Sequence, residues 1–358
     1  MLTLYGTLAF YFCREGIKYM KVVPVQEAVG MVLCHDITQI IPGEFKGRAF
    51  KKGHIVQEED IPKLLDIGKQ NIYVWEINDK MLHENDAAMR IARAAAGSGI
   101  NLTEPKEGKV SLVANRMGLL KINTKALYKI NEMEEVMFAT LHTNQIVYEG
   151  KILAGTRIIP LVIQGKKVSR IENICKLNYP VMEVKPFKSL KAGIVTTGSE
   201  VYHGRIEDKF GPVVKNKFES WGSTVIRQIF VSDSTDMIAK AIKVLLQEGV
   251  DIITVTGGMS VDPDDLTPAG IKEAGGRIVT YGAPTLPGAM FMVAYIGDVP
   301  VLGLPGCVMY YRSSIFDLVV PRILAGETIT RKDIISLGHG GLCVHCKECK
   351  YPDCGFGK

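Results

Sequence analysis

The chain has 358 residues, 47% of them hydrophobic and 23% charged, and a formal net charge of +5. This ordinary composition predicts a globular protein with a sizeable core, and the mild charge suits a small anionic ligand without indicating the basic stripe typical of nucleic-acid binding. No apolar run reaches the roughly 18–20 residues of a spanning helix, so we expect no membrane partner.

The first part of the chain divides into two sections by composition. Residues 1–19 hold an apolar stretch without a preceding basic residue or a small-residue cleavage site, so we interpret them as an extension or a disordered tail rather than a signal peptide. Residues 20–80 alternate short apolar runs with Gly and Pro breaks, which predicts a small β-rich module. Within it, the acidic start and glycine end of residues 58–68 predict a short helix.

Residues 81–186 are predicted to form a mixed α/β module. Residues 83–98 have acids first, alanines within and glycine at the end, which is typical of a helix capped by its first residues, His83 to Asp86. A second helix is predicted over residues 123–133, between short strands. Pro180 and Pro186 mark residues 177–190 as the linker to the next domain.

From Lys191 onward, apolar strands alternate with helices. This alternation predicts an α/β domain over residues 187–330, built on a three-layer, mostly parallel sheet with helices on both faces. The predicted helices cover residues 207–221, 234–248, 265–274 and 307–325. Residues 331–358 form a separate Cys-rich tail.

Glycine-containing motifs stand at the ends of the predicted strands. TTGSE (196–200), TGGMS (256–260) and GLPG (303–306) each follow a strand, and LPGA (286–289) precedes one. The carboxyl ends of parallel strands are where such sheets bind ligands, and glycines let backbone N–H groups approach an anion closely. Each motif alone is also compatible with a plain tight turn. Together they predict an anion site, while the dinucleotide fingerprint and the Walker loop are both missing.

A family resemblance adds to this interpretation. The run TTGSE…EDKFGP…VSDSTD…TVTGGMSVDPDDLTPAGI…LPGAM…GLPGCVMYYRSS closely resembles the molybdopterin-binding domain family. That family includes molybdopterin molybdotransferases (molybdenum insertases) and molybdopterin adenylyltransferases. The resemblance extends from about Lys191 to Gly326, whereas residues 20–190 resemble the insertase's additional domains only in size and position.

The resemblance implies a set of site residues. Asp265 would assist a divalent metal or the phosphoanhydride, with Asp233 and Asp208 as further catalytic candidates, and the expected metal is Mg²⁺. From the residues alone, these three aspartates are better explained as helix caps or first-turn acids. The cofactor-binding candidates are Thr197, Gly198, Ser199, Glu200, Gly257, Gly258, Ser260, Pro287, Gly288, Pro305 and Gly306.

Several positions depart from the family pattern. Lys209-Phe210 stands in place of Ser-Asn, Asp262-Pro263 follows the Gly-Gly turn, Ala289 replaces a lysine, and Cys307 replaces an asparagine. The leading hypothesis is that the protein binds adenylylated molybdopterin and exchanges adenylate for molybdate, with release of AMP. The departures favour a second hypothesis, a molybdopterin carrier or partner protein without catalysis. The Asp-x-Thr-Pro run that begins at Asp265 supports a third, adenylyl transfer to molybdopterin.

The tail carries a separate signal. Cys343, Cys346, Cys349 and Cys354 have the spacing C-x₂-C-x₂-C-x₄-C, and four such thiolates can enclose a Zn²⁺ ion or an iron–sulfur cluster. Free thiols are the alternative. We expect the metal to supply the folding energy of a tail too short to bury a core.

The remaining cysteines indicate where the protein resides. The other four are scattered rather than spaced as a disulfide scaffold, which favours a reducing, cytoplasmic location. Besides molybdopterin and molybdate, the expected partners are a molybdoenzyme or another cofactor-biosynthesis protein. A second copy of the chain is also expected, because relatives in this family commonly associate.

Overall fold

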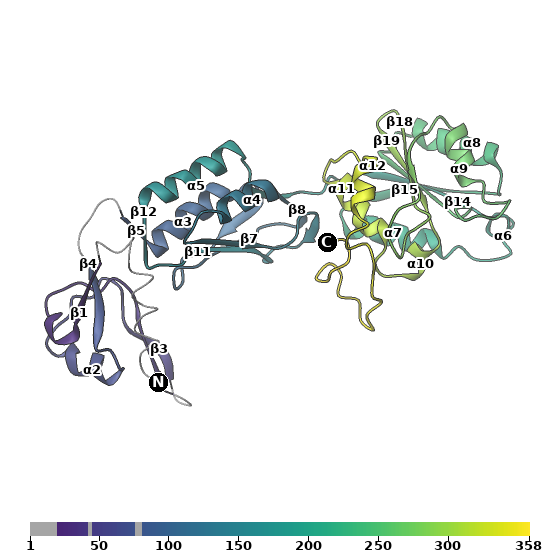
Figure 1. Ribbon diagram of the computed structural model, residues 1–358. Coiled ribbons are helices and arrows are strands. Elements are labelled where there is room, and N and C mark those ends of the chain that lie inside the picture. The colour runs from purple at the N-terminus through teal and green to yellow at the C-terminus, as the bar shows by residue number, and fades with distance from the viewer. Residues whose placement is uncertain (1–19, 42–44, 76–80) are drawn as a thin grey trace. The chain divides into compact units, whose positions relative to one another are not determined.

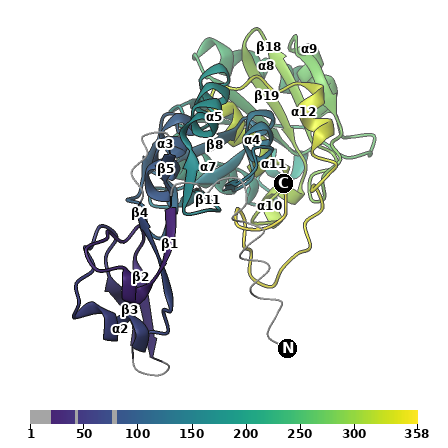
Figure 2. The ribbon, with the colours of Figure 1, turned by 60° about the vertical axis from the view of Figure 1, so that its left-hand side comes forward.

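The computed structural model describes residues 20–41, 45–75 and 81–358, so the expectation for residues 1–19 lies outside the described residues. The chain forms two compact units (Figures 1 and 2). Unit 1 comprises Met1–Val113, Asn123–Leu141 and Ile152–Met182, and unit 2 comprises Ala114–Ile122, His142–Lys151 and Glu183–Lys358. The units therefore interleave in sequence, whereas the five sections proposed above follow one another along the chain.

The first half of unit 1 is a small β-rich fold. β1 (Met20–Pro24) pairs antiparallel with β4 (Asn71–Trp75), and β2 (Ile37–Ile41) pairs antiparallel with β3 (Phe45–Phe50). A 3₁₀ turn, η1 (Val25–Glu27), and α2 (Asp60–Asp66) complete it, so the predicted short helix is confirmed. Its core contains buried aliphatic side chains from the strands and from α2, among them Val23, Leu33, Leu64 and Val74.

The second half of unit 1 packs helices on an antiparallel sheet. The sheet has the order β6-β7-β11-β9, and a separate pair joins β12 to β5. Helix α3 places Ala87, Ala88, Ile91, Ala92 and Ala95 on one buried face, as helical periodicity requires. The elements are β5 (Met81–His83), α3 (Glu84–Ala95), β6 (Ile100–Leu102), β7 (Val110–Ala114), α4 (Thr124–Asn131), β9 (Val136–Thr140), β11 (Ile152–Ile158), β12 (Val162–Gln164) and α5 (Gly165–Leu177).

Local signals account for these helices in part. His83 is the N-cap of α3 and its Nδ1 accepts the Asn85 N–H at 3.2 Å, which confirms the predicted capping role. Helix α4 lies within the range predicted for it. Helix α5 was not predicted as a continuous helix. Arg90 of α3 holds it through two bonds to the carboxylate of Glu172, at 2.8 and 2.6 Å.

Unit 2 is built on a six-stranded sheet in the order β15-β14-β16-β19-β18-β17. The first four strands are parallel, and β18 and β17 run antiparallel to their neighbours. The prediction of a mostly parallel α/β sheet is therefore confirmed. The strands are β14 (Lys191–Thr197), β15 (Thr224–Val231), β16 (Ile252–Thr256), β17 (Arg277–Tyr281), β18 (Met292–Ile296) and β19 (Val299–Leu304).

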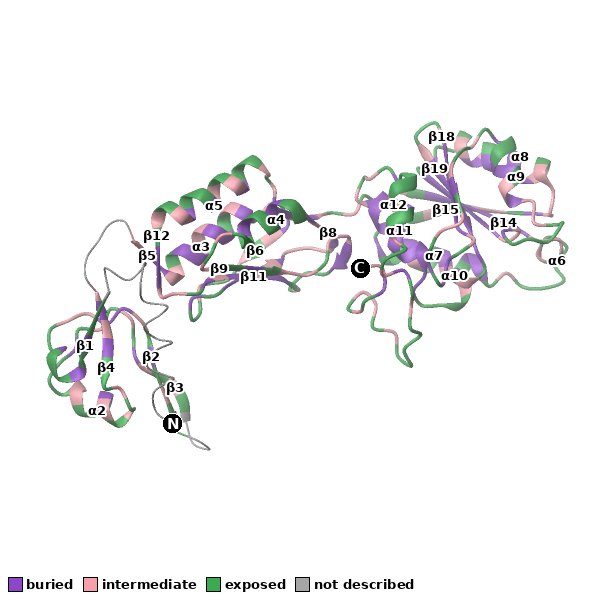
Figure 3. Cartoon of the chain, in the orientation of Figure 1, coloured by how far each residue is buried: buried purple, intermediate pink, exposed green. Residues whose placement is uncertain are grey.

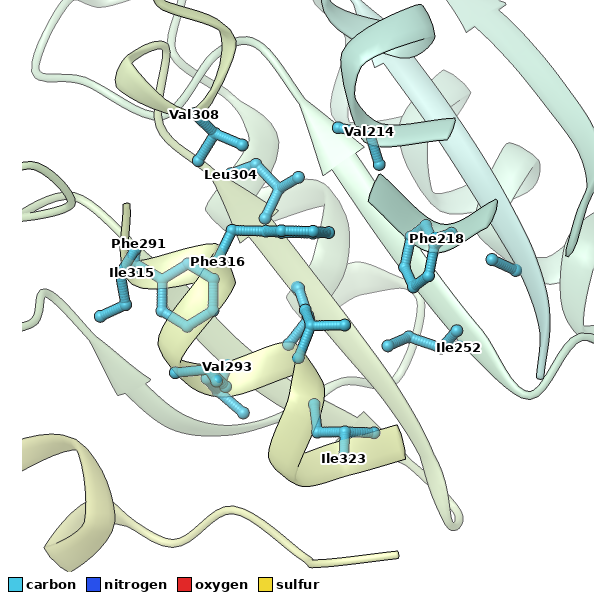
Figure 4. Close-up of a cluster of buried hydrophobic side chains, with 14 of the residues drawn as sticks. Val214, Phe218, Ile252, Phe291, Val293, Leu304, Val308, Ile315, Phe316 and Ile323 are labelled. Carbon is cyan, nitrogen blue, oxygen red and sulfur yellow. The ribbon is translucent and has the colours of Figure 1, made fainter. Parts of the chain in front are cut away.

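Helices cover both faces of this sheet, and each face has its own core. One core gathers side chains of α7 and α11, including Phe218 and Phe316 (Figure 4). Trp221 stacks on Phe316 in the same core. The other gathers side chains of α8 and α9, including Ile238, Leu245 and Ile271. The central strands β14, β16, β18 and β19 are buried along most of their length (Figure 3). The helices are α6 (Ser199–Tyr202), α7 (Phe210–Ser220), α8 (Thr235–Gln247), α9 (Thr267–Glu273), α10 (Cys307–Tyr310), α11 (Ile315–Leu324) and α12 (Arg331–Ser336).

One expectation about unit 2 is wrong. The single helix predicted over residues 307–325 is broken into α10 and α11, because Ser314 and Asp317 form a capping box that starts a new helix. The predicted linker over residues 177–190 contains the boundary at which unit 1 ends (Met182) and the last part of unit 2 begins (Glu183), and it also contains β13 (Met182–Lys185). That strand joins β8 (Gly118–Ile122) and β10 (Gln145–Val147) in a sheet of order β10-β8-β13.

Candidate functional site

The predicted site residues lie in loops that meet at one edge of the unit 2 sheet. Parallel strands β15, β14, β16 and β19 end there, at Val231, Thr197, Thr256 and Leu304. Antiparallel β18 begins there, since Met292 pairs with Gly303. We call this set the edge loops: residues 197–200, 231–234, 256–260, 286–290 and 304–306. The strand register thus places the motifs at one edge of the sheet, as expected.

Thr197 and the Gly257-Gly258 turn form the tightest part of this edge. The two glycines have φ values of +89° and +55°. A Cβ added at Gly257 would lie 2.6 Å from the Thr197 carbonyl oxygen and 2.7 Å from its hydroxyl. Glycine is therefore required here by both backbone conformation and close approach.

The hydroxyl of Thr197 is an unsatisfied group at this edge. Thr197 is buried, and its Oγ1 has no hydrogen-bond partner within the described parts of the chain. A buried hydroxyl without a partner costs about 1–3 kcal/mol, so such a group is normally satisfied by a partner, either an ordered water or a ligand. The Thr197 hydroxyl is therefore a hydrogen-bond donor open to a water or a ligand beside the Gly-Gly turn.

Asp233 organises the neighbouring loop. Its Oδ2 accepts the backbone N–H of Ser199 at 2.8 Å and the Ser199 hydroxyl at 3.1 Å. The Ser199 and Ser232 hydroxyls lie 2.9 Å apart. This carboxylate thus fixes the position of Ser199, which makes it a positioning residue for a predicted ligand contact.

Asp208 caps α7, as the alternative interpretation of this residue expected. Its carboxylate accepts the backbone N–H groups of Phe210 at 2.9 Å and Gly211 at 3.1 Å. Gln228 of β15 donates from Nε2 to Asp208 at 2.6 Å and to the Thr196 hydroxyl at 2.8 Å. Asp208 and Gln228 also line a surface hollow of about 460 Å³. Sequence reasoning missed Gln228 because nothing local distinguishes it.

Asp265 belongs to the turn that follows the Gly-Gly motif. Its Oδ2 accepts the Asp262 N–H at 2.9 Å, and the Asp265 N–H donates to the Asp262 carbonyl at 3.0 Å. Along the described ranges we find no hydrogen bond to its Oδ1. The carboxylate therefore keeps one oxygen for another interaction.

Tyr281, at the end of β17, was also missed. Its hydroxyl donates to the carbonyls of Met259 and Ser260, at 3.0 and 3.2 Å, and so holds the turn from the far side of the sheet. Burial, with the nearby Asp265 carboxylate, raises the pKa of Tyr281, so the phenol remains a proton donor. The signal in the sequence was a tyrosine at the end of a predicted strand at the same edge.

The two proline-glycine loops differ in what their glycines do. Gly288 has φ +138°, and a Cβ there would lie 2.5 Å from Cγ2 of Ile315. Packing against α11 therefore explains this glycine without a ligand. Gly306 has φ −52° and nothing within 4 Å of an added Cβ, so this glycine faces open space, whereas Pro305 is buried.

The three aspartates do not converge on one point. Asp208, Asp233 and Asp265 bond to different segments, as described above. Over residues 20–41, 45–75 and 81–358, no group of three or more His, Cys, Asp or Glu side chains has the geometry to hold a single metal ion. A Mg²⁺ ion at this edge would therefore have to be held by one carboxylate together with a phosphate group of the ligand.

The Cys-rich tail is docked on unit 2 by its own contacts. Phe356 is 4% exposed, and the Tyr351 hydroxyl donates to the Asp317 carbonyl at 2.8 Å. Lys151 pairs with Asp353 at 2.8 Å. The tail therefore packs on an existing core, and its four cysteines are not among any group of three or more His, Cys, Asp or Glu side chains that could hold a metal ion within the described residues.

Comparison with known proteins agrees with the fold of unit 2. Residues 193–325 match the family described as "Probable molybdopterin binding domain", and residues 22–76 match "Domain of unknown function (DUF8806)". A CinA-like protein of Mycobacterium sp. (strain MCS) is 36% identical over 89 residues, which is 25% of this chain and 21% of that protein. A CinA-like protein of Mycobacterium avium (strain 104) is 33% identical over 95 residues, which is 26% and 22%. The chain spans about a fifth of the length of these curated relatives.

Two solved structures that match parts of this chain are described as molybdopterin biosynthesis proteins. The enzyme MoaB from Thermus thermophilus has 20% identity and a TM-score of 0.32, covering 38% of this chain and 98% of that one. The MoeA protein from Pyrococcus horikosii has 14% identity and a TM-score of 0.33, covering 91% and 80%. In the described part of the chain, no helix is both long and apolar enough to cross a membrane.

Proposed function

We propose, starting from the molybdopterin-binding family that residues 193–325 match, that this protein binds a phosphate-bearing pterin at the edge loops and acts in molybdenum-cofactor biosynthesis. The observation that carries this proposal is the buried, unpartnered hydroxyl of Thr197 beside the Gly257-Gly258 turn. A phosphate oxygen is a strong acceptor for such a donor. The open backbone at Gly306 offers a second place for an anion.

The leading chemistry is the exchange of adenylate for molybdate on adenylylated molybdopterin, with AMP as the leaving group. Asp265 supports it, since one of its oxygens holds the 262–265 turn and the other is left for a cation. Mg²⁺ is usually held by one or two carboxylates together with substrate phosphates, so a single aspartate suits this ion. Bound there, Mg²⁺ would offset the charge of the phosphoanhydride and of molybdate.

Other observations favour a carrier without catalysis. Asp208 is occupied as the cap of α7, and Lys209-Phe210 follows it where the family has Ser-Asn. Ala289 removes a lysine that could neutralise an anion. The third candidate, adenylyl transfer, is weakened because the Thr267 hydroxyl donates to the Gly257 carbonyl at 2.8 Å and so supports the turn.

Binding tests the proposal first. We expect Thr197→Val to weaken binding of adenylylated molybdopterin about tenfold, because roughly 1–3 kcal/mol is lost when a hydrogen bond to a buried group is removed. The matched control is Thr254→Val, a buried threonine inside β16 whose hydroxyl bonds weakly to the Gly193 carbonyl at 3.4 Å. Calorimetric titration of the wild type and both variants gives the comparison. Equal affinity in all three would overturn the assignment of the edge loops.

Turnover then separates the three candidates. We expect AMP release from adenylylated molybdopterin that requires molybdate and Mg²⁺, and that Asp265→Ala abolishes while binding is retained. Tight binding without AMP release would leave the carrier as the function. Consumption of ATP with free molybdopterin would identify the adenylyltransferase.

A further inference from the structure

Unit 1 contains a hollow of about 1060 Å³ that is rich in positive charge, and we call it the basic hollow. Residues of both halves of unit 1 line it. Six of its described lining residues are cationic: Lys46, Arg48, Lys51, Lys52, Lys106 and Arg157. We propose that the basic hollow binds a small anion with two or more phosphate groups, of which inorganic pyrophosphate is the simplest. None of its described lining residues belongs to the edge loops, so this proposal stands apart from the function proposed above.

The basic hollow keeps an excess of positive charge after its ion pairs are taken into account. Nη1 of Arg48 lies 3.0 Å from the Asp36 carboxylate, and Nη2 of Arg157 lies 3.7 Å from the Glu84 carboxylate. The third carboxylate among the described lining residues is that of Glu107. Six cations and three carboxylates leave three positive charges in excess. An anion with two phosphate groups would offset this excess.

Four lysines supply the excess charge. In the parts of the chain that the structure describes, we find no ion pair at Lys46, Lys51, Lys52 or Lys106. Lys52 is half-buried, and its Nζ lies 5.8 Å from the centre of the Trp75 ring, so an aromatic face rather than a carboxylate stabilises this ammonium group. Cations that line one concave surface focus a positive potential there, which attracts anions. Lysine ammonium groups are common ligands of phosphate.

Hydrogen bonds between the two halves of unit 1 hold the basic hollow in shape. His83 Nδ1 accepts the N–H of Asn85 at 3.2 Å, so its Nε2 carries the proton and donates to the Cys34 carbonyl at 2.7 Å. Burial lowers the pKa of His83 to about 4, so the ring is neutral at pH 7 and adds no charge. The Asn85 side-chain carbonyl accepts the Gly108 N–H at 3.1 Å and so anchors residues 105–107. A lining fixed before the ligand arrives lowers the entropic cost of binding.

The size and polarity of the basic hollow favour a small phosphate compound. Its volume is close to the upper end of the roughly 300–1,000 Å³ typical of small-molecule sites. Pro105 and Leu161 are the apolar members of its described lining apart from a glycine, so an apolar ligand would find little surface to cover. Nucleic-acid binding requires an extended basic stripe, whereas the charge described here gathers in one concave site. A compact polyanion therefore matches the basic hollow better than either alternative.

Calorimetric titration of the intact chain with sodium pyrophosphate at low ionic strength tests the proposal. We expect Lys51→Gln and Lys106→Gln each to weaken binding about tenfold, because each removes a hydrogen bond between charged groups. The matched control is Lys125→Gln, in α4 of unit 1, which removes the same charge from an exposed lysine outside the described lining. This control should bind pyrophosphate as the wild type does. Circular dichroism of the three variants shows whether the fold is retained.

Several results would overturn the proposal. One is the absence of pyrophosphate binding by the wild type, and another is an equal affinity, or an equal loss of affinity, in all three lysine variants. A loss of affinity in Thr197→Val but in neither Lys51→Gln nor Lys106→Gln would assign pyrophosphate to the edge loops instead. Stronger binding of a short polyaspartate peptide than of pyrophosphate would show that the basic hollow recognises carboxylates rather than phosphate groups.

Discussion

Thr197 and Gly257 show how single residues set the geometry of the candidate site. The approach of Gly257 to the backbone and hydroxyl of Thr197 leaves no room for a Cβ, and the hydroxyl is left without a protein partner among the described residues. Gly257 thus leaves this edge free of a side chain, while the adjacent Thr197 presents a hydrogen-bond donor. Neither feature depends on a charged side chain, which explains why the net charge of the chain says little about this site.

Replacing Gly257 separates crowding from backbone strain. Gly257→Ala forces both a positive φ and a contact of 2.6 Å with Thr197, whereas Gly275→Ala, at φ +100°, meets nothing within 4 Å. We expect Gly275→Ala to cost about 1–2 kcal/mol of stability, from the left-handed backbone alone, and Gly257→Ala to cost more and to abolish pterin binding. Denaturant unfolding, followed by the fluorescence of Trp221, measures the loss of stability in each variant. Equal losses of stability in the two variants would show that the surrounding structure shifts to relieve the crowding at Gly257, and would contradict the prediction.

At the scale of elements, helix ends carry much of the polar structure of unit 2. Helices α11 and α12 both begin with capping boxes, Ser314 with Asp317 and Thr330 with Asp333. Arg322 of α11 donates to Asp333 at 2.6 Å and to Glu327 at 2.8 Å, so it ties the end of one helix to the start of the next. Residues 310–313, just before this break at Ser314, line a hollow together with Cys343, Cys346, Cys349 and Cys354 of the tail.

The cap of α12 predicts a pH dependence. Burial alone would raise the pKa of Asp333, but bonds from Thr330 and Arg322 outweigh it and lower the pKa from 3.8 to about 2. The ionised carboxylate therefore adds stability above about pH 4, and this contribution is lost as the pH falls toward 2. With a side chain 27% exposed, the contribution is about 1–2 kcal/mol.

The variant Asp333→Asn tests the direction of this pH dependence. Its stability deficit against the wild type should be largest near neutral pH and should shrink as the pH falls through the range from about 4 to about 2. Unfolding free energies of both proteins, measured across that range with Trp221 as the probe, check it. A deficit that does not change with pH would show that Asp333 acts only as a neutral cap.

At the scale of the whole molecule, each unit has its own core and its own tryptophan. Trp75 lies in β4 of unit 1, and Trp221 lies 6% exposed in a core of unit 2. The unit 1 sections cluster around small aliphatic cores, whereas unit 2 buries both faces of a six-stranded sheet. Two units with separate cores need not unfold together.

Single-tryptophan variants test this independence. Trp75→Phe leaves Trp221 as the probe of unit 2, and Trp221→Phe leaves Trp75 as the probe of unit 1. We expect the Trp221 signal to change at higher denaturant concentration than the Trp75 signal, because more apolar surface is buried around it. Circular dichroism of each variant serves as the reference. Coincident transitions would mean that the two units unfold as one.

The sequence by itself determined the α/β class of unit 2, the order of its motifs and their family. Alternation of apolar strands with helices is a local pattern, and so are the glycines that end the strands, since each depends on the conformation of a few neighbouring residues. The spacing of the four tail cysteines was equally visible. The strand pattern also placed Thr197, Gly257 and Pro305 at one edge, because the carboxyl ends of parallel strands meet there.

Only the tertiary structure decided what depends on distant residues meeting. Tyr281 supports a turn 21 and 22 residues earlier, Gln228 links Asp208 to Thr196 across the sheet, and β8 and β10 join β13 rather than the strands of unit 1. The four tail cysteines line the same hollow as residues 310–313, which lie about 30 residues earlier in the chain. Such contacts follow from the packing of segments far apart in the chain, which no local periodicity records.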